Sequence, residues 1–354
     1  MDAGRTGLRL APVVLAFAIE VLAASPAPAA LTVVTTTTDL ESITRAVGGD
    51  RVTVTSIAHG YEDPHFVQAK PSYMMVARKA DLWVRVGLEL EIGWEELILD
   101  GCRNPRIRIG TPGHLDASEG VLRLEVPQVR VTREMGDVHP LGNPHYWLDP
   151  LNARLMARTI AGRLAELGPA QAEVFKANLE AFTRALDARM FGENLVREVG
   201  GDALWALAMK GTLPEFLERH GLAGKLGGWL GTLRPHRGTT VVTYHRSWSY
   251  FAHRFGLTVP IELEPKPGIP PSPAHLAKVV ELMKAQGAKV VLMEPFYSRK
   301  AADAVAARTG ARVVVCPNSV GGEKDASDYP ALMDLIVGRL DAALRGAEGA
   351  AGRR

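Results

Sequence analysis

Short β-branched runs alternate with amphipathic stretches in the first third of the chain. Apolar residues recur at helical spacing between these runs, and polar loops separate the segments. Strands that alternate with helices predict a parallel sheet with helices on both faces. The predicted strands are residues 31–38, 51–58, 81–87 and 106–110, and the predicted helices are residues 39–47, with Asp39 as N-cap, and 71–80.

The pattern changes after Asp149, where helical spacing continues to about Met190. Gly168 and Pro169 divide this stretch into two helices. The second, at about residues 170–190, is long enough to connect two lobes. Paired glycines then punctuate short helical pieces, so residues 191–238 read as a helical insertion.

The alternation of strands and helices returns in the last third of the chain. The predicted strands are residues 239–245, 288–295 and 311–317, and the predicted helices are residues 247–257, 273–286, 298–309 and 331–344. The predicted fold class is therefore α/β, with two parallel-sheet lobes joined by a long linker helix. The predicted domains are a signal peptide at 1–30, an N-terminal α/β lobe at 31–168, the linker helix at 169–190, and a C-terminal α/β lobe at 191–354 that carries the insertion at about 191–238.

The first thirty residues have the pattern of a signal peptide. Arg5 and Arg9 precede an apolar stretch, which Glu20 interrupts, and small residues follow up to Ala30. The alternative is an unstructured N-terminal segment that contains an apolar run by chance. We expect export, and we expect no lipid anchor, since no cysteine stands at the predicted cleavage site. No apolar run reaches the roughly 18 residues of a membrane span.

Charge and motifs exclude several classes of function. The net charge is only +2 and no basic run or stripe is present, so we expect no nucleic-acid partner. The common metalloprotease, α/β-hydrolase, P-loop and dinucleotide-binding signatures are all missing, which argues against an enzyme. The two cysteines, Cys102 and Cys316, lie far apart; a disulfide would suit an exported protein, but two buried thiols are the simpler interpretation.

Histidines stand where ligands bind in parallel α/β sheets, at the carboxyl ends of strands. His65 and His245 follow predicted strands, and His145 lies in the loop that leads into the long helices. Both "DPHF" and "NPHYW" place a proline before the histidine and aromatic residues after it. The proline stiffens the loop, and aromatic residues can exclude water from a metal site. Asp149 and Pro150 then predict a capped helix start.

A lone loop histidine more often lies on the surface or caps a helix, so these patterns alone leave the question open. His139, six residues before His145, is an accessory or neighbouring residue in this interpretation. Glu294 follows a predicted strand and more often holds a loop than a metal. The histidines for which we expect a surface or capping role are His59, His114, His220, His236 and His275.

Five ordered segments resemble one known family. They are "VVTTTTDLESITRAVGGDRVTVTSIAHGYEDPHFVQAKPS", "NPHYWLDPLNARLMA", "VVTYHRSWSYFAHRFGL", "EPKPGIPPSPAHLAKVVELMK" and "EPFYSRKAADAVAARTGARVVV". Together they resemble the periplasmic zinc- and manganese-binding proteins of ABC importers, the cluster A-I group that includes ZnuA- and TroA-like proteins. The resemblance extends over residues 31–344. It implies two α/β lobes joined by one rigid helix, with a metal ion between them.

The resemblance also implies the ligands. The first and second family histidines fall on His65 and His145, and the third position, which is often a carboxylate in manganese-binding members, falls on His245. Cys316 stands where the family has an aspartate. Cys316 could bind metal as a thiolate, or it could be a structural thiol that leaves the fourth position to water, to Glu62 or to His139. We favour the structural thiol.

The predicted function is a monomeric periplasmic receptor that captures a divalent transition metal and delivers it to an inner-membrane ABC permease. Three imidazoles favour Zn²⁺ over Mn²⁺, which prefers oxygen ligands. The affinity should fall as the pH drops below about 6.5, because only neutral imidazole binds metal. The alternative is a zinc-dependent hydrolase with a three-histidine site and Glu62 or Glu294 as general base. A third alternative is a surface adhesin.

Overall fold

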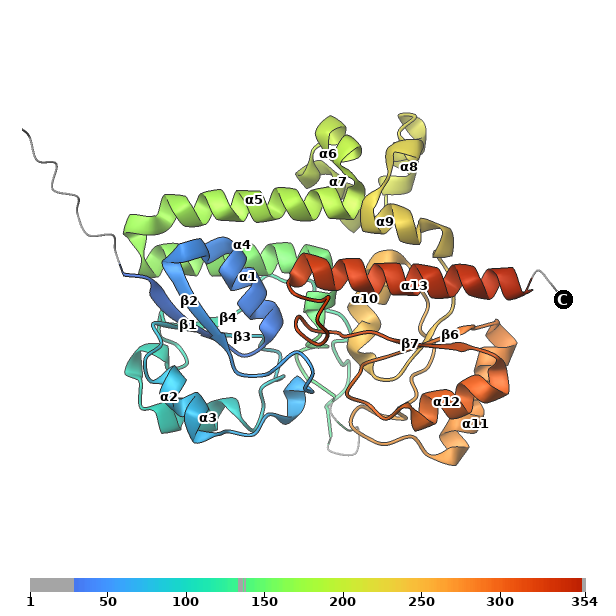
Figure 1. Ribbon diagram of the computed structural model, residues 1–354, viewed down its shortest axis with the longest axis horizontal. Helices are drawn as coiled ribbons and strands as arrows, with labels where there is room; N and C mark the ends of the chain where they lie inside the picture. Colours follow the sequence, from blue (N-terminus) through green and yellow to red (C-terminus); the bar gives the residue numbers. More distant parts are fainter. Residues whose placement is uncertain (1–28, 133–135, 137, 352–354) are drawn as a thin grey trace, which may run out of the picture.

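Two parallel β-sheets organise the computed structural model, which describes residues 29–132, 136 and 138–351. Figure 1 shows them side by side, the N-terminal sheet in blue to cyan and the C-terminal sheet in orange to red. The first sheet has the strand order β2-β1-β3-β4 and the second β5-β6-β7. Their strands are β1 Leu31–Thr35, β2 Val52–Ser56, β3 Leu82–Arg85, β4 His114–Asp116, β5 Val242–Thr243, β6 Val290–Met293 and β7 Arg312–Val315.

Helices cover both faces of each sheet. The bounds are α1 Thr38–Gly48, α2 Pro71–Ala77, α3 Glu95–Cys102, α4 Pro150–Leu167, α5 Ala172–Phe191, α6 Glu193–Val199, α7 Gly201–Met209, α8 Leu213–Arg219, α9 Gly228–Leu233, α10 Ser249–Phe255, α11 Pro273–Gln286, α12 Arg299–Thr309 and α13 Tyr329–Ala351. The predicted α/β class with two parallel sheets is confirmed.

Neighbouring residues of one strand pack into different cores, as expected of a sheet that is buried on both faces. In β1, Val33 joins the large core that includes residues of α1 and α4, whereas Val34 packs with residues of α2 and α3. Leu292 and Met293 of β6 alternate in the same way, because Met293 faces the core that includes residues of α11 and α12. Short, continuous runs of apolar residues are therefore typical of these strands.

The large core continues from one lobe into the other. It contains Val33 and Ile43 of the N-terminal lobe together with Leu332 and Ile336 of α13. The loop before α13 also contacts α1 directly: the hydroxyl of Thr38 donates to the carbonyl of Val320 at 2.6 Å. The lobes thus share one apolar interior on the side of the long helices.

Two predictions of local structure were wrong. Residues 106–110 form no strand; Pro105–Ile107 is a 3₁₀ helix, and the fourth strand is β4, His114–Asp116. Asp39 does not cap α1. It lies buried in the first turn, and its Oδ1 accepts the backbone N–H of Val320 at 3.0 Å. A contact to a residue 281 positions away in the sequence replaces the local cap.

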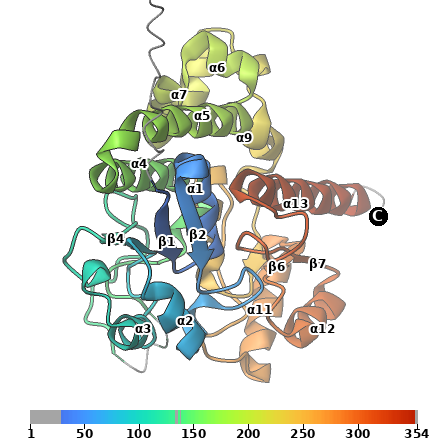
Figure 2. The ribbon, with the colours of Figure 1, turned by 60° about the vertical axis from the view of Figure 1, so that its left-hand side comes forward.

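Helix α5 runs along α4 and ends beside the insertion (Figure 1). Helices α6 and α7 stand on the side of α5 that faces away from the sheets, as both views show (Figure 2). The predicted short helical pieces within residues 191–238 are present as α6 to α9. Residues 1–28 of the predicted signal peptide lie outside the described residues. Among the helices of the described part, none has the length and apolar character needed to cross a bilayer.

Candidate metal centre

Three histidine side chains from distant parts of the chain meet between the lobes. His65 lies in the 3₁₀ helix Pro64–Phe66 that follows β2, His145 directly precedes the 3₁₀ helix Tyr146–Leu148, and His245 follows β5. One ring nitrogen from each lies within 4.8 Å of the other two. The ring centroids are 5.1 Å apart for His65 and His145, 5.7 Å for His65 and His245, and 5.3 Å for His145 and His245.

Each of these rings is oriented through its Nδ1. The Nδ1–H groups donate to Asp63 Oδ1 at 2.7 Å, to Asn143 Oδ1 at 2.9 Å and to Glu264 Oε2 at 2.7 Å, for His65, His145 and His245 respectively. This fixes the tautomer and leaves the Nε2 lone pair of each ring available, as in metal-binding histidines of proteins. Nε2 of His65 is buried and has no hydrogen-bond partner in the part of the chain that the structure describes.

The loop that holds His145 is fixed at its C-terminal end. Asp149 is the N-cap of α4, and its Oδ1 accepts the N–H of Leu151 at 2.9 Å, so the predicted cap is confirmed. Arg254 of α10 donates to both oxygens of Asp149 at 2.7 Å. Trp147 donates to the carbonyl of Asn318 at 2.7 Å. Two contacts with the C-terminal lobe therefore hold the segment that follows His145.

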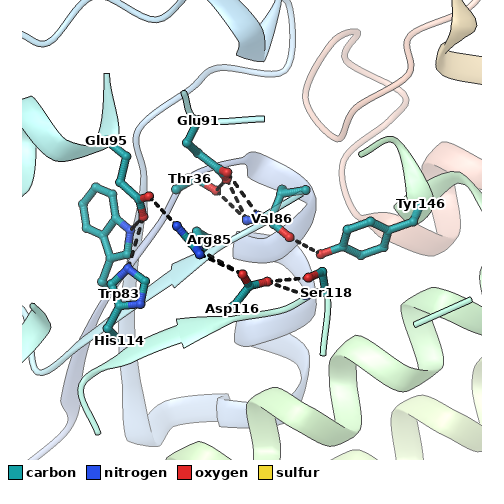
Figure 3. Close-up of polar contacts among 11 residues, drawn as sticks. Thr36, Trp83, Arg85, Val86, Glu91, Glu95, His114, Asp116, Ser118 and Tyr146 are labelled. Carbon is teal, nitrogen blue, oxygen red and sulfur yellow. Dashed lines mark hydrogen bonds and ion pairs between the residues drawn. The ribbon is translucent and has the colours of Figure 1, made fainter. Parts of the chain in front are cut away.

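A second loop, after β3, contacts the segment that follows His145 (Figure 3). The carboxylate of Glu91 accepts the N–H of Val86 at 2.7 Å and the N–H of Gly87 at 3.1 Å. The hydroxyl of Tyr146 donates to the Val86 carbonyl at 2.7 Å. Leu88, next in the loop, has a left-handed backbone with φ of 53°. This conformation is costly for leucine and persists only where the surroundings hold it.

The three rings have different electrostatic environments. Burial, and then the neighbouring His65 and His245, lower the pKa of His145 well below its usual value. Burial also opposes charge on His245, but the hydrogen bond to Glu264 and the charge of Glu294 raise the pKa of His245 above its usual value. Without metal, a proton therefore resides on His245 more readily than on His145.

The three residues considered for the fourth ligand position lie outside the group of converging ring nitrogens. The ring of His139 is beside His65, with the centroids 5.3 Å apart, and burial lowers the pKa of His139 to about 3. Cys316 is fully buried in the large core, and burial raises the pKa of its thiol to about 12. Glu62 accepts the N–H of His59 at 3.2 Å within its own loop. None of these joins the group of three whose ligand atoms lie within 4.8 Å of one another.

Five histidines were expected at the surface or as caps, and for His114 and His236 this was wrong. Both are buried, and they pair with Glu95 at 3.2 Å and with Asp341 at 2.9 Å. The sequence reasoning also missed Asp63, Asn143 and Glu264. A signal existed for the first two, because each stands two residues before its histidine in D-P-H and N-P-H. No local signal identifies Glu264, which lies 19 residues after its histidine.

A small cavity of about 30 Å³ adjoins the histidines and is lined by His139, His145 and His245, among others. About 10–15 Å³ is enough for one water, so this cavity has room for a hydrated ion's remaining ligand. A cavity of about 590 Å³ lies elsewhere, between α1 and the loop before α13, and no histidine lines it. Its lining offers no comparable set of metal ligands, so we place the candidate site at the smaller one.

A family model described as "ZnuA: Zinc-uptake complex component A periplasmic" matches residues 33–190 and 230–343. The unmatched residues between these ranges fall within the predicted insertion. The model thus covers most of both lobes.

Individual relatives carry names for different metals. The chain is 26% identical over 323 residues to the iron-binding protein YfeA of Yersinia pestis, which covers 89% of this chain and 85% of that protein. It is 27% identical over 198 residues to the high-affinity zinc uptake system protein ZnuA of Brucella abortus, covering 55% and 48%. It is 30% identical over 156 residues to the manganese ABC transporter substrate-binding lipoprotein PsaA of Streptococcus pneumoniae, covering 44% and 48%. The chain thus spans about half the length of the last two proteins.

A crystal structure of ZnuA superposes with a TM-score of 0.66 at 24% identity, covering 89% of this chain and 99% of that one. A manganese-bound periplasmic metal-binding protein from Candidatus Liberibacter asiaticus gives a TM-score of 0.62 at 20% identity, with 89% and 99% covered. At these identities, the likeness establishes the fold.

Proposed function

Because the chain belongs to the ZnuA family of periplasmic metal-binding proteins of ABC importers, we propose that it captures Zn²⁺ between its lobes through His65, His145 and His245. The observation that carries this proposal is the convergence of three ring nitrogens within 4.8 Å of one another. Each ring also has its Nδ1 bound to an acceptor, which supports binding through Nε2.

The donor set supports zinc among the metals for which relatives are named. Imidazole suits Zn²⁺, while Mn²⁺ prefers carboxylates, carbonyls and water. Imidazole also suits iron, so the proposal for zinc over iron rests on the tetrahedral geometry that three imidazoles and one further ligand allow. The relatives named for iron, zinc and manganese indicate that family membership alone does not fix the metal.

Proteins of this family are binding components of transport systems and not enzymes. Family membership therefore gives no support to the hydrolase alternative. We therefore propose that the metal is cargo, that residues 1–30 direct export to the periplasm, and that the loaded, monomeric protein delivers its ion to an inner-membrane ABC permease.

The test is metal content combined with selectivity. Purified protein should bind about one Zn²⁺ per chain, as a single tetrahedral site does, and His65→Ala, His145→Ala and His245→Ala should each reduce binding strongly. Cys316→Ala and His253→Ala, the latter at an exposed position of α10, should bind as the wild type does. Equal metal content in the wild type and all three site variants would refute the site.

Competition between Zn²⁺, Fe²⁺ and Mn²⁺ for the same protein tests the choice of metal. Zn²⁺ should displace both others at equal concentration. Retention of Fe²⁺ or Mn²⁺ under these conditions would contradict the zinc assignment and leave the three-histidine site intact.

A further inference from the structure

We infer that His139 is the fourth protein ligand, so that four imidazoles surround the metal; this inference rests on the proposed function. A tetrahedral ion held by three histidines has one position left. The family resemblance places Cys316 where the family has an aspartate, but the thiol of Cys316 is fully buried and hydrogen-bonds to Arg339. Glu62 is turned toward its own loop. Among the protein residues that the sequence offered for this position, His139 remains.

The position of the His139 ring fits this role. Its centroid lies 5.3 Å from that of His65. The three converging rings are separated by 5.1 to 5.7 Å, so His139 stands as close to His65 as those rings stand to one another. The cavity beside the site is lined by His139 together with His145 and His245. His139 thus borders the same cavity as two of the three converging histidines.

The hydrogen bonds of His139 repeat the pattern of the other rings. It hydrogen-bonds to the backbone of Leu88, and its Nε2 is buried without any hydrogen-bond partner among the described residues. The bond to Leu88 is therefore made through Nδ1. A buried nitrogen without a partner is costly, and such groups are rare in folded proteins. Nε2 of His65 is in the same situation, and a shared metal ion would satisfy both.

The loop after β3 provides the support that such a ligand needs. Leu88 has its unusual left-handed backbone in this loop, and Glu91 holds the preceding residues through Val86 and Gly87. The same loop anchors Tyr146, the neighbour of His145. One loop thus positions two histidines of the site. The strained backbone of Leu88 agrees with this role, since strained backbone clusters at ligand sites.

His139 must still move slightly to bind. Its ligand nitrogen lies outside the group whose atoms are all within 4.8 Å of one another. The cavity of about 30 Å³ that it lines allows a small shift of the ring toward the other three. Four neutral nitrogen donors would favour Zn²⁺ over Mn²⁺ more strongly than three nitrogens and a water.

X-ray absorption spectroscopy of the zinc-loaded protein tests the inference directly. The wild type should show four imidazole nitrogens, and His139→Ala should show three together with one oxygen. In competition with a chelator, His139→Ala should raise the zinc Kd about tenfold or more, as loss of a supporting group at a metal site does. His253→Ala removes an exposed imidazole of α10 and should change neither result.

Three imidazoles and one oxygen in the wild type would overturn the inference, whatever the variant does. An unchanged Kd in His139→Ala would overturn it as well. These outcomes are distinct from failure of the proposed function, in which His65→Ala would bind zinc as tightly as the wild type. Near-ultraviolet circular dichroism of each variant confirms that the fold is retained.

Discussion

His245 differs from His145 because a carboxylate, and not an amide oxygen, accepts its Nδ1–H. Glu264 accepts its Nδ1–H at 2.7 Å, and this bond raises the pKa of His245 although burial opposes the shift. His145 has no such partner, and the pKa of His145 is lowered. Of these two residues, His245 is therefore the one at which a proton competes with the metal ion.

We predict that, as the pH decreases, the zinc affinity already begins to fall at a pH above 6.5. The raised pKa means that His245 carries a proton in the metal-free protein, and zinc must displace that proton. Calorimetric titrations in buffers of different ionisation enthalpy should show proton release at pH 6.5. Glu264→Gln should shift the pH profile of the affinity to lower pH and weaken binding about 10–100-fold at high pH. Identical profiles for the two proteins would contradict this role of Glu264.

At the scale of single residues, the sequence indicated the three histidines of the site but not the residues that orient them. His65, His145 and His245 were visible because each stands at a strand end or before a helix, where parallel sheets bind ligands. Their assignment as ligands remains a proposal. Glu264 and Leu88 could not be inferred, because only the folded chain brings them beside the rings.

At the scale of elements, the start of α4 depends on a buried ion pair with α10. Asp149 is fully buried, and the side chain of Arg254 is nearly so. Both guanidinium donors lie 2.7 Å from the carboxylate oxygens. The sequence predicted the cap at Asp149 from local chemistry. It could not predict Arg254, which lies 105 positions further along the chain.

Arg254→Ala should lower the free energy of unfolding by about 3–5 kcal/mol, because it leaves the charge of Asp149 buried and unpaired. Urea denaturation followed by circular dichroism measures this change. Arg299→Ala is the matched control, since it breaks an exposed ion pair with Asp303 and should cost about 1 kcal/mol or less. A similar small cost for both variants would show that the buried pair is not important for stability.

The strand prediction that failed has a physical cause at the same scale. Residues 106–110 alternate between charged and apolar side chains, as an exposed strand does, but Pro105 begins a 3₁₀ helix there. Asn104 caps it by accepting the N–H of Arg106 at 3.1 Å. Local capping outweighed the alternation, and the sheet takes His114–Asp116 as its edge strand instead.

At the scale of the whole molecule, the lobes contact each other through Asp39 of α1 and the loop before α13. Burial raises the pKa of Asp39 to about 7, well above the usual value of a carboxyl group. The folded protein thus favours the neutral carboxyl group. The stability that Asp39 contributes is complete below about pH 4 and is lost as the pH rises through about 7.

We therefore predict that Asp39→Asn becomes more stable relative to the wild type as the pH rises. Between about pH 4 and pH 7 the difference in the free energy of unfolding should grow by about 1.4 kcal/mol per pH unit, and above pH 7 it should level off because Asp39 is then ionised in both states. Urea denaturation at a series of pH values from the usual carboxylate pKa to above the raised pKa of Asp39 provides the measurement. Asp50→Asn, at an exposed position, should show no such trend, and a parallel trend in both variants would exclude Asp39 as the cause.

The arrangement of the whole molecule was predicted in outline. Two lobes, the long helix and the helical insertion follow from the order of strand and helix patterns. The domain boundaries at residues 168 and 190 stay predictions. The shared core could not be foreseen, because the pattern shows which face of a helix is apolar and not which distant helix covers it.

The first and last helices of the fold meet in this shared core. The N–H of Tyr329, where α13 begins, donates to the hydroxyl of Ser42 in α1 at 2.9 Å, across 287 positions of the chain. Contacts of such separation form late and slow the folding of a chain. In a polypeptide that emerges from its amino end, α4 and α5 can cover most of α1 early, but the part of α1 that faces α13 stays uncovered until synthesis is almost complete. The shared core should then form in one cooperative step. A chain that ends before residue 329 should expose apolar surface in both lobes.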